Sequence, residues 1–504
     1  MSAMSAAAAC GNEPSSDAAP TVSPTETPEA ADGPTTEGGA DASSVDSTAA
    51  PLVPLWSKQF GEASAKEIEG AKAVATDPAG NVIVVGEIWG AADFGGGVLA
   101  TAGGQDIFVA KLDPNGKHLW SRRFGDAGAF QVAQAVAVDA AGNVVFAGSF
   151  DGHVDFGGGD LTSAGGTDIF VAKLDSNGKH MWSKRFGDVA DGQKARSISV
   201  DTAGAVVVAG ELAGAADFGG GALTATGGAD AFVVKLDASG THLWSHRYGG
   251  DGKTTAAAVR TDGSNNVVIV GDFGFTVDFS GTGGGDAGTG GGEGPVLTSL
   301  GGSDAFVTKL DPNGKHLWSK RLGGAAKRQS GDAVAIDAAG NLLVASTFEG
   351  TVNFGGDDLV DLGFPTFGMS NVAVVKLTPA GVHVWSKGFG DAARQFIRAV
   401  AFDHGGNALL SGQFTGTMNF GGADLTTTAK SLFLVKLDGK GAHVWSKKFG
   451  SVGEVETGGV VTDFADSIVL AGRFSGKVDF GAGPHSTADS DYDAVVVKLP
   501  PAGQ

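Results

Sequence analysis

Six histidines stand in the same local context, two residues before a tryptophan, and a repeated histidine is a natural candidate for a metal site. They are His118, His180, His242, His316, His383 and His443. Neutral imidazole is a common zinc ligand, and a zinc–nitrogen bond is about 2 Å long. The six copies fall in separate repeat units, whose equivalent outer strands should lie roughly 20 Å apart when neighbouring strands are about 4.8 Å apart. We therefore predict that these histidines are structural and that the protein uses no metal and no cofactor.

Two sets of aspartates invite comparison with calcium loops. Segments resembling Val-Asp-Phe-Gly-Gly contain Asp93, Asp155, Asp217, Asp278 and Asp479, and Gly-Gly-x-Asp segments contain Asp106, Asp168, Asp230 and Asp304. Calcium takes six to eight oxygen ligands, often from alternate positions of one loop, whereas each segment offers one carboxylate. We predict that these aspartates cap turns. The chain also lacks a Gly-x-Ser-x-Gly elbow and a His-Glu-x-x-His motif, so we predict no catalytic residue.

The elements that must position these residues follow a repeat. A Trp-Ser pair recurs at Trp56, Trp120, Trp182, Trp244, Trp318, Trp385 and Trp445, at intervals of 60 to 74 residues. Each period contains four short segments rich in Val, Phe, Ile and Trp, joined by turns rich in Gly and Asp, such as Ser176-Asn177-Gly178. Glycine late in such a connection is typical of a hairpin, because it adopts a positive φ at little cost. No sustained apolar pattern has helical spacing. The sequence predicts an all-β protein of four-stranded antiparallel units.

The two ends of the globular part indicate how the ring closes. The repeats open at 55–60 with a fourth strand that has no third strand before it, and they end at 493–499 with a third strand that has no fourth after it. Seven third strands match seven fourth strands only if the first strand in sequence completes the last unit. We therefore predict a seven-bladed β-propeller over 52–500, closed by its N-terminal strand, which leaves only short, protected edges.

These strings resemble a known family. Gly165-Gly-Thr-Asp-Ile-Phe-Val-Ala-Lys-Leu-Asp175, the Gly142-Asn143 turn and Trp-Ser-Lys-Arg-Phe-Gly187 are similar to the bacterial β-propeller repeats called SBBP repeats, with a strand order like that of NHL propellers. The likeness covers every period from Trp56 to Leu499. Later copies depart from it, with Asn353 and Asn419 in place of aspartate. The resemblance implies the propeller fold and says little about function.

The N-terminal region has a different composition. The segment 1–10 resembles the shortened end of a bacterial lipoprotein signal, in which Cys10, the only cysteine, would be the lipidation site. The alternative is an incidental cysteine on a low-complexity tail. The segment 11–51 is rich in Ala, Ser, Thr and Pro and should be a disordered acidic linker, and 501–504 is a short tail. We expect a protein of the bacterial cell envelope, anchored in the outer membrane or periplasmic or extracellular, that meets a membrane only through its lipid.

The net charge of −21 argues against nucleic-acid binding, and no apolar run reaches the roughly 18 residues of a membrane span. If the first strand of each unit is innermost, its opening residue faces the axial channel. Counting back from the strand-ending aspartates places Lys72, Gln134, Arg196, Ala257, Asp332, Arg398 and Gly458 at this mouth. Lys72, Gln134, Arg196, Asp332 and Arg398 are the candidates for binding a ligand. The alternative is a mouth that is simply solvated, which would leave these positions free to vary.

Because like charges repel, we expect the cations at this mouth to serve a ligand rather than folding. The function that fits best is a non-enzymatic, envelope-anchored binding scaffold, and we expect a monomer whose partner is an unidentified protein or glycan. The alternative is a propeller enzyme, a lyase or hydrolase of a glycan or peptide, with its site at the same channel mouth.

Overall fold

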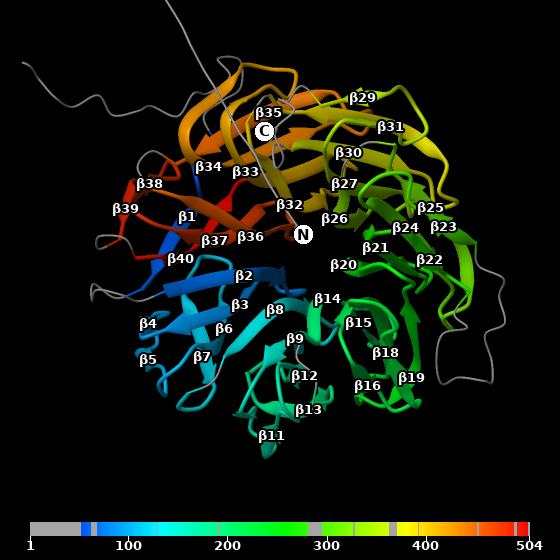
Figure 1. Cartoon of the computed structure of the whole chain (residues 1–504). Coiled ribbons are helices and arrows are strands. Elements are labelled where there is room, and N and C mark those ends of the chain that lie inside the picture. The colour runs from blue at the N-terminus through cyan, green and yellow to red at the C-terminus, as the bar shows by residue number, and fades with distance from the viewer. Residues whose placement is uncertain are drawn as a thin grey trace, which may run out of the picture. The chain divides into compact units, whose positions relative to one another are not determined.

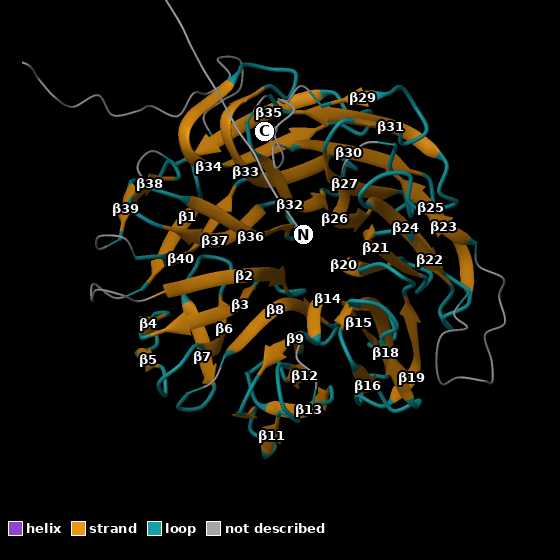
Figure 2. Ribbon diagram, viewed as in Figure 1, coloured by secondary structure: helices purple, strands orange, loops and turns teal. Residues whose placement is uncertain are grey.

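The computed structural model describes residues 52–61, 68–128, 130–189, 192–280, 295–325, 328–361, 370–391, 393–450, 453–487 and 491–501. Cys10, the segments 1–10 and 11–51, and the tail 501–504 apart from Pro501 lie outside these residues. All regular structure in the described part is β-strand (Figure 2). None of it is a helix that could cross a bilayer.

Seven four-stranded antiparallel sheets surround one axis (Figure 1). We number these blades 1 to 7 after their innermost strands, which are β2 (Ile68–Thr76), β8 (Gln131–Val138), β14 (Lys194–Val200), β20 (Thr254–Thr261), β26 (Gln329–Ile336), β32 (Gln395–Phe402) and β36 (Val455–Thr462). The second strands are β3 (Val82–Trp89), β9 (Val144–Phe150), β15 (Val206–Leu212), β21 (Val267–Phe273), β27 (Leu342–Phe348), β33 (Ala408–Met418) and β37 (Ile468–Phe474).

The third strands are β6 (Asp106–Leu112), β12 (Asp168–Leu174), β18 (Asp230–Leu236), β24 (Asp304–Leu310), β30 (Asn371–Leu377), β34 (Leu425–Leu437) and β40 (Asp493–Leu499). The outermost strands are β7 (His118–Phe124), β13 (His180–Phe186), β19 (His242–Tyr248), β25 (His316–Leu322), β31 (His383–Phe389), β35 (His443–Phe449) and β1 (Trp56–Phe60).

Short ribbons lie between the second and third strands. They are β4 (Ala91–Asp93) with β5 (Val98–Ala100), β10 (His153–Asp155) with β11 (Asp160–Thr162), β16 (Ala215–Asp217) with β17 (Ala222–Thr224), β22 (Thr276–Asp278) with β23 (Val296–Thr298), β28 (Thr351–Val352) with β29 (Leu359–Val360), and β38 (Lys477–Asp479) with β39 (Pro484–Ser486). In blade 6 the long strands β33 and β34 continue directly into this ribbon.

The N-terminal strand closes the ring. Strand β1 pairs antiparallel with β40, so blade 7 has the order β1-β40-β37-β36. Gln59 of β1 donates a hydrogen bond to Asp493, the role that Arg123 plays toward Asp106 in blade 1. The predicted all-β, seven-bladed propeller of four-stranded blades is confirmed, and the pairing of β1 is the closure that the sequence indicated.

The hydrophobic core is divided among the blade interfaces. Seven clusters of buried side chains each join two neighbouring blades, and the one between blades 7 and 1 includes Phe60 and Phe94. Third strands such as β6 are buried along their whole length because blades cover both of their faces. This explains why they read as continuous apolar runs, as strands buried on both faces do. A single blade therefore cannot bury its own apolar surface.

The turn between the first two strands follows the chemistry expected from its sequence. In blade 2, Asp139 Oδ1 accepts the backbone N–H groups of Ala141 and Asn143, and Gly142 has a φ of 79°. Asp139 also forms an ion pair of 2.9 Å with Lys173 of the third strand, and both side chains are almost fully buried. Each of the other six blades has an equivalent Lys–Asp pair. The turn at the axis is thereby tied to the middle of its blade.

Tryptophans of the outer strands fasten each blade to the next. The indole of Trp120 in blade 1 donates a hydrogen bond of 3.0 Å to Ser176 O, in a hairpin of blade 2, and Lys111 Nζ donates to the same carbonyl oxygen. Five more tryptophans make the equivalent bond, at 2.9 to 3.2 Å. The ring of Trp120 lies against Gly178, where a Cβ would come within 2.9 Å of it. A side chain at Gly178 would force the two blades apart.

The seventh copy of this contact differs because the chain is interrupted between β40 and β1. Blade 7 has no hairpin between its third and fourth strands, and the buried indole N–H of Trp445 finds no acceptor among the described residues. Leu52 packs against this cluster instead, and its carbonyl oxygen accepts Lys447 Nζ at 2.9 Å. The seam is thus filled by the segment that precedes β1.

The two tryptophan environments predict different costs for the same substitution. Trp120→Phe should destabilise the protein by about 1 kcal/mol more than Trp445→Phe, because only the first removes a hydrogen bond, and the second deletes an unsatisfied buried donor. Both variants lose the same ring area, so each is the control for the other. Chemical-denaturation midpoints by tryptophan fluorescence or circular dichroism measure the difference. Equal losses would show that the contact of Trp120 with the next hairpin adds nothing beyond burial.

Candidate functional site

The residues expected at the channel mouth share a structural feature. Each innermost strand pairs with its neighbour except at one skipped residue, a β-bulge. The skipped residues are Lys72, Gln134, Arg196, Ala257, Asp332, Arg398 and Gly458. A bulge frees its side chain from the sheet register and re-aims it. All seven residues line one cavity of about 140 Å³, so the register count placed them correctly around the axis.

Two of the mouth cations have structural partners. Lys72 Nζ lies 2.6 Å from Glu87, and Arg196 lies 2.8 Å from Glu211. Burial raises the pKa of Glu211, but Arg196 and Lys253 outweigh it and hold the pKa below its ordinary value. Our expectation that the mouth cations serve only a ligand is therefore wrong for Lys72 and Arg196. Each neutralises a buried glutamate of a second strand.

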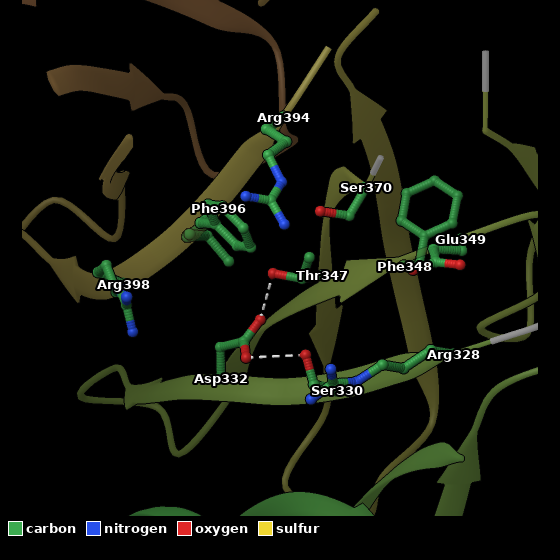
Figure 3. Close-up of a pocket in the computed structure, with 11 residues that line it drawn as sticks. Arg328, Ser330, Asp332, Thr347, Phe348, Glu349, Ser370, Arg394, Phe396 and Arg398 are labelled. Atoms are coloured by element: carbon green, nitrogen blue, oxygen red, sulfur yellow. Dashed lines mark hydrogen bonds between the residues drawn. The ribbon is translucent and has the colours of Figure 1, made fainter. Parts of the chain in front are cut away.

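Arg398 and Asp332 occupy a different environment (Figure 3). The guanidinium of Arg398 forms no ion pair with any described residue. Asp332 accepts hydrogen bonds from Ser330 Oγ at 2.9 Å and from Thr347 Oγ1 at 2.6 Å. Burial raises the pKa of Asp332 to about 6, with the nearby Asp272 adding to the effect and the two hydroxyl donors and Arg398 opposing it. Asp332 therefore changes charge in the range of ordinary cellular pH.

Counting along the first strand alone missed several residues of this site. Lys253, Arg328 and Arg394 lie four residues before the bulge residues of blades 4 to 6, and Asp272 lies on a second strand. Lys253, Arg328 and Asp272 line a cavity of about 390 Å³ together with Arg196, Arg398 and Asp332. Arg394 lines an adjoining cavity of about 260 Å³. The sequence contains a signal for these residues, because the position four residues before the bulge also varies from blade to blade.

The smaller cavity lies between blades 5 and 6. Figure 3 shows Arg328, Ser330 and Asp332 on one side and Arg394, Phe396 and Arg398 on the other, with Thr347 and Ser370 between them. The guanidinium of Arg394 lies 6.0 Å from the ring centre of Phe396. Such a cation–π contact is electrostatically favourable and places the guanidinium of Arg394 beside the ring of Phe396.

Asp272 is the second carboxyl group of the larger cavity. It accepts a hydrogen bond of 3.2 Å from Thr255 Oγ1. Burial raises the pKa of Asp272 above its ordinary value, although Arg328 and Thr255 oppose the shift. Two carboxyl groups with raised pKa values therefore share a cavity with several cations, an arrangement more common at functional sites than elsewhere.

The opposite side of the ring is neutralised internally. Glu456 accepts Lys430 Nζ at 2.5 Å and is paired with Arg473 at 2.8 Å, and Lys430 also lies 3.1 Å from Glu454. Burial raises the pKa of Glu456, but Lys430 and Arg473 hold it below its ordinary value. These charges of blades 6, 7 and 1 are thus used within the protein, whereas Arg328 and Arg398 of blades 5 and 6 form no ion pair with a described residue.

The repeated histidines have a structural role. His118 Nε2 lies 3.1 Å from Ser121 Oγ, and the other five make the same contact with the serine three residues on. Their rings lie against glycines such as Gly96, where a Cβ would be 2.1 Å from the ring of His118. In blade 7, His485 from β39 takes this place beside Ser57. Within the described residues, no three histidine, aspartate, glutamate or cysteine side chains form a cluster that could hold a metal ion.

The repeated aspartates act on the backbone. Asp93 Oδ1 accepts the N–H groups of Gly95 and Gly97, and Asp155 and Asp217 make the same two bonds in blades 2 and 3. Asn353 and Asn419 accept the first of these bonds, from Gly355 and Gly421. Asp106 accepts Ala102 N and pairs with Arg123. The prediction that these aspartates cap turns is confirmed for these residues.

The raised pKa of Asp332 predicts a pH-dependent stability. The folded protein holds this proton more tightly than the unfolded chain, so the contribution of Asp332 to stability falls as pH rises from about 4 to about 6 and stays low above that. Asp332→Asn should therefore raise the free energy of unfolding at pH 7.5 by about 1–2 kcal/mol, a value reduced for partial solvent access, and should have little effect near pH 4. Urea midpoints at the two pH values measure this, with Asp160→Asn on the rim as control. A variant less stable than wild type at pH 7.5 would contradict it.

Comparisons with known proteins give distant likenesses. No protein-family model matches the chain. An uncharacterized WD repeat-containing protein of Acanthamoeba polyphaga mimivirus is 25% identical over 229 residues, which are 39% of this chain and only 16% of that protein. This chain therefore matches a small part of a much longer relative.

The likeness to solved structures is also low. An ulvan lyase, a polysaccharide lyase, is 10% identical with a TM-score of 0.44, over 88% of this chain and 97% of its own. The β-propeller domain of the Trilobed protease from Pyrococcus furiosus is 8% identical with a TM-score of 0.40, over 83% and 95%. A protein of unknown function from Bacteroides caccae is 13% identical with a TM-score of 0.33, over 67% and 89%. These likenesses supply no activity for this chain, which by its own strand pairing is a β-propeller repeat protein.

Proposed function

We propose that this protein is a non-enzymatic binding scaffold that captures an acidic saccharide at the channel mouth, over blades 4 to 6. The observation that carries the proposal is the position of Arg328 and Arg398. Both line the two adjoining cavities, and neither forms an ion pair with a described residue, whereas Lys72 and Arg196 are neutralised. Arginine binds carboxylate and sulfate groups through two parallel hydrogen bonds, which makes it well suited to such ligands.

The rest of the lining supports a saccharide. Hydroxyl and amide side chains, among them Ser330, Thr347 and Gln134, can exchange hydrogen bonds with sugar hydroxyls. The half-buried ring of Phe396 offers an apolar face to a sugar ring. The cavity volumes of about 260 and 390 Å³ lie on either side of the lower limit of about 300 Å³ for ligand sites, and the two cavities adjoin, which suits a short oligosaccharide.

Charge favours an anion over a cation. The larger cavity is lined by four cationic side chains and two carboxyl groups, and two of the four cations, Arg196 and Lys253, share the carboxylate of Glu211. The smaller cavity is lined by three cationic side chains and two carboxyl groups, so each cavity keeps an excess of one positive charge. Since Asp332 has a raised pKa, its negative charge is only partial near pH 6. This local positive balance lies within a protein of net charge −21, so an anionic ligand would be drawn to this one region of the surface.

A propeller enzyme that cleaves a glycan or peptide at the same place is the second candidate. The observation that favours it is the pair of carboxyl groups, Asp272 and Asp332, because raising the pKa of a carboxyl group prepares it to act as a general acid. We still place the binding scaffold first. The arginines and the two carboxyl groups account for binding of an anion, and this account requires no nucleophile or general base.

We propose also that the repeats are of the SBBP type and that the propeller is a monomer displayed on the bacterial cell envelope. In this arrangement Cys10 carries the lipid and 11–51 is an acidic spacer. The sequence resemblance at 1–10 and the single cysteine support this part of the proposal. Its partner would be a glycan of the surroundings, and nucleic acid would be disfavoured by the charge.

The ligand proposal is tested with digalacturonate as the probe and maltose as its neutral counterpart. We expect the wild-type protein to bind digalacturonate and not maltose in isothermal titration calorimetry. The double variant Arg328→Gln/Arg398→Gln should weaken binding at least about 30-fold, since a lost hydrogen bond to a charged group contributes about 1.5–3 kcal/mol. Binding should also weaken as salt is added, because exposed charges are screened over about 8–10 Å.

The matched control removes the same charge elsewhere. Arg122→Gln/Lys320→Gln alters two exposed cations of outer strands and should bind like wild type. Equal losses in the two double variants would show that only net charge matters, and inorganic sulfate binding as tightly as digalacturonate would contradict a saccharide site. Shortened sugar products in the same mixtures would favour the enzyme.

The anchor is tested separately by expression from the full reading frame in a bacterial host. We expect the protein to sediment with membranes and Cys10→Ser to release it, because a multiply acylated cysteine gives stable attachment that the acidic linker alone cannot. Mass spectrometry of the mature N-terminus is the direct measurement. An unmodified residue 10 in the exported protein would end the lipoprotein interpretation.

A further inference from the structure

The proposed anion site contains two groups that oppose it. Asp332 and Asp272 line the same cavity as Arg328 and Arg398. A bound carboxylate or sulfate would lie close to both, and like charges at short distance in a partly buried site repel one another strongly. The site can accept a full negative charge more easily if one of these carboxyl groups first gives up its own charge by taking a proton.

Asp332 is better placed to take that proton. Its two hydrogen-bond partners are the hydroxyl groups of Ser330 and Thr347. A hydroxyl group can rotate from donor to acceptor, so a protonated Asp332 can donate to one of them and leave no buried group unsatisfied. Asp272 is stabilised in its ionised form by the charge of Arg328 and by a hydrogen bond from Thr255. Protonation of Asp272 would remove its attraction to Arg328.

The charged groups around Asp332 come from every neighbouring element. Arg196 lies on β14, Asp272 on β21, Arg328 ahead of β26 and Arg398 on β32, all lining the larger cavity with Lys253. Arg260 on β20 lines the axial cavity below, and its guanidinium is held by Ser197 Oγ and Val259 O. Glu349 and Arg394 line the smaller cavity. Cations outnumber carboxyl groups in this set, and they stabilise the ionised form of Asp332 as long as no anionic ligand is bound to them.

We propose that anion capture at the channel mouth is coupled to proton uptake by Asp332. The complex holds one proton more than the free protein and gives it up when the ligand leaves. This inference rests on the proposed function and adds its regulation. When an anion engages Arg328 and Arg398, Asp332 loses their compensating charge and gains a new negative neighbour. Both changes favour its protonated form, and by linkage the proton strengthens anion binding by the same factor.

The consequence for pH follows from the free protein. With the pKa of Asp332 at about 6, binding raises it further and opens a window above pH 6 in which the complex holds a proton that the free protein lacks. Affinity should rise as pH falls through this window and level off below about pH 6. The ligand would therefore be captured in acidic surroundings and released in neutral or alkaline ones.

The experiment is calorimetry of digalacturonate binding in two buffers of different ionisation enthalpy. The carboxylates of this probe stay ionised above about pH 5, so they contribute no proton change. We expect uptake of several tenths of a proton per ligand at pH 7, falling toward zero at pH 5. Affinity should be about fivefold to tenfold higher at pH 6 than at pH 7.5, within the limit of tenfold per pH unit for one proton.

Two variants assign the proton. Asp332→Asn should abolish the uptake and flatten the pH dependence, whereas Asp160→Asn on the rim ribbon β11 should retain both. Uptake that persists in Asp332→Asn would move the proton to another group and overturn the assignment. If that variant does not fold, the wild-type measurement still decides whether binding takes up a proton.

The failure of this inference and that of the proposed function can be told apart. Digalacturonate binding with no proton uptake and no pH dependence would overturn the coupling and leave the anion site intact. Absence of binding from pH 5 to pH 8 would overturn the proposed function, and the coupling with it. Tighter binding at higher pH would contradict the coupling by its sign alone.

Discussion

The contact that fastens an outer-strand tryptophan to a hairpin of the next blade is the constraint on which the rest of the structure depends. A blade is a sheet with two apolar faces, so it gains stability only when neighbours cover both of them. The indole N–H of Trp120 and the ammonium group of Lys111 converge on one backbone carbonyl oxygen of the following blade. Lys111 is itself paired with Asp77 at the axial turn. The axis, the middle of the blade and the next blade are therefore linked through one buried lysine.

Removing one partner of such a buried ion pair would leave an uncompensated charge, which is far more costly than the pair is stabilising. The pair recurs in all seven blades, and Lys111, Lys173, Lys235, Lys309 and Lys498 also donate a hydrogen bond to a backbone carbonyl oxygen of the next blade. The same contacts hold the innermost strands that carry the residues of the channel mouth. Its side chains project from bulges on strands that are held from both sides, and this is why one residue per blade can vary without altering the ring.

Variation at those bulge positions has divided the channel mouth into two regions. On blades 7 and 1, Arg473, Glu456 and Glu87 neutralise one another within the protein. On blades 5 and 6, Arg328 and Arg398 form no ion pair with a described residue, and burial raises the pKa values of two carboxyl groups that line the same cavity, Asp272 and Asp332. The charges at the mouth therefore differ from blade to blade although the strands repeat. The repeat supplies the frame, and departures from the repeat supply the chemistry.

How far the sequence alone could reach is clear from particular residues. The strands, the number of blades, the closing strand, and the residues around the axis all follow from local patterns, since side-chain alternation and turn glycines are properties of short segments. The partners of the mouth residues do not. Lys72 meets Glu87 and Arg196 meets Glu211 across a hairpin whose register is shifted by the bulge, and a shift of one residue changes which side chains face each other. Whether Arg398 is paired, and how strongly Asp332 holds its proton, depends on charges brought together from different blades, because electrostatic energy is set by distance and burial in the folded ring rather than by separation along the chain.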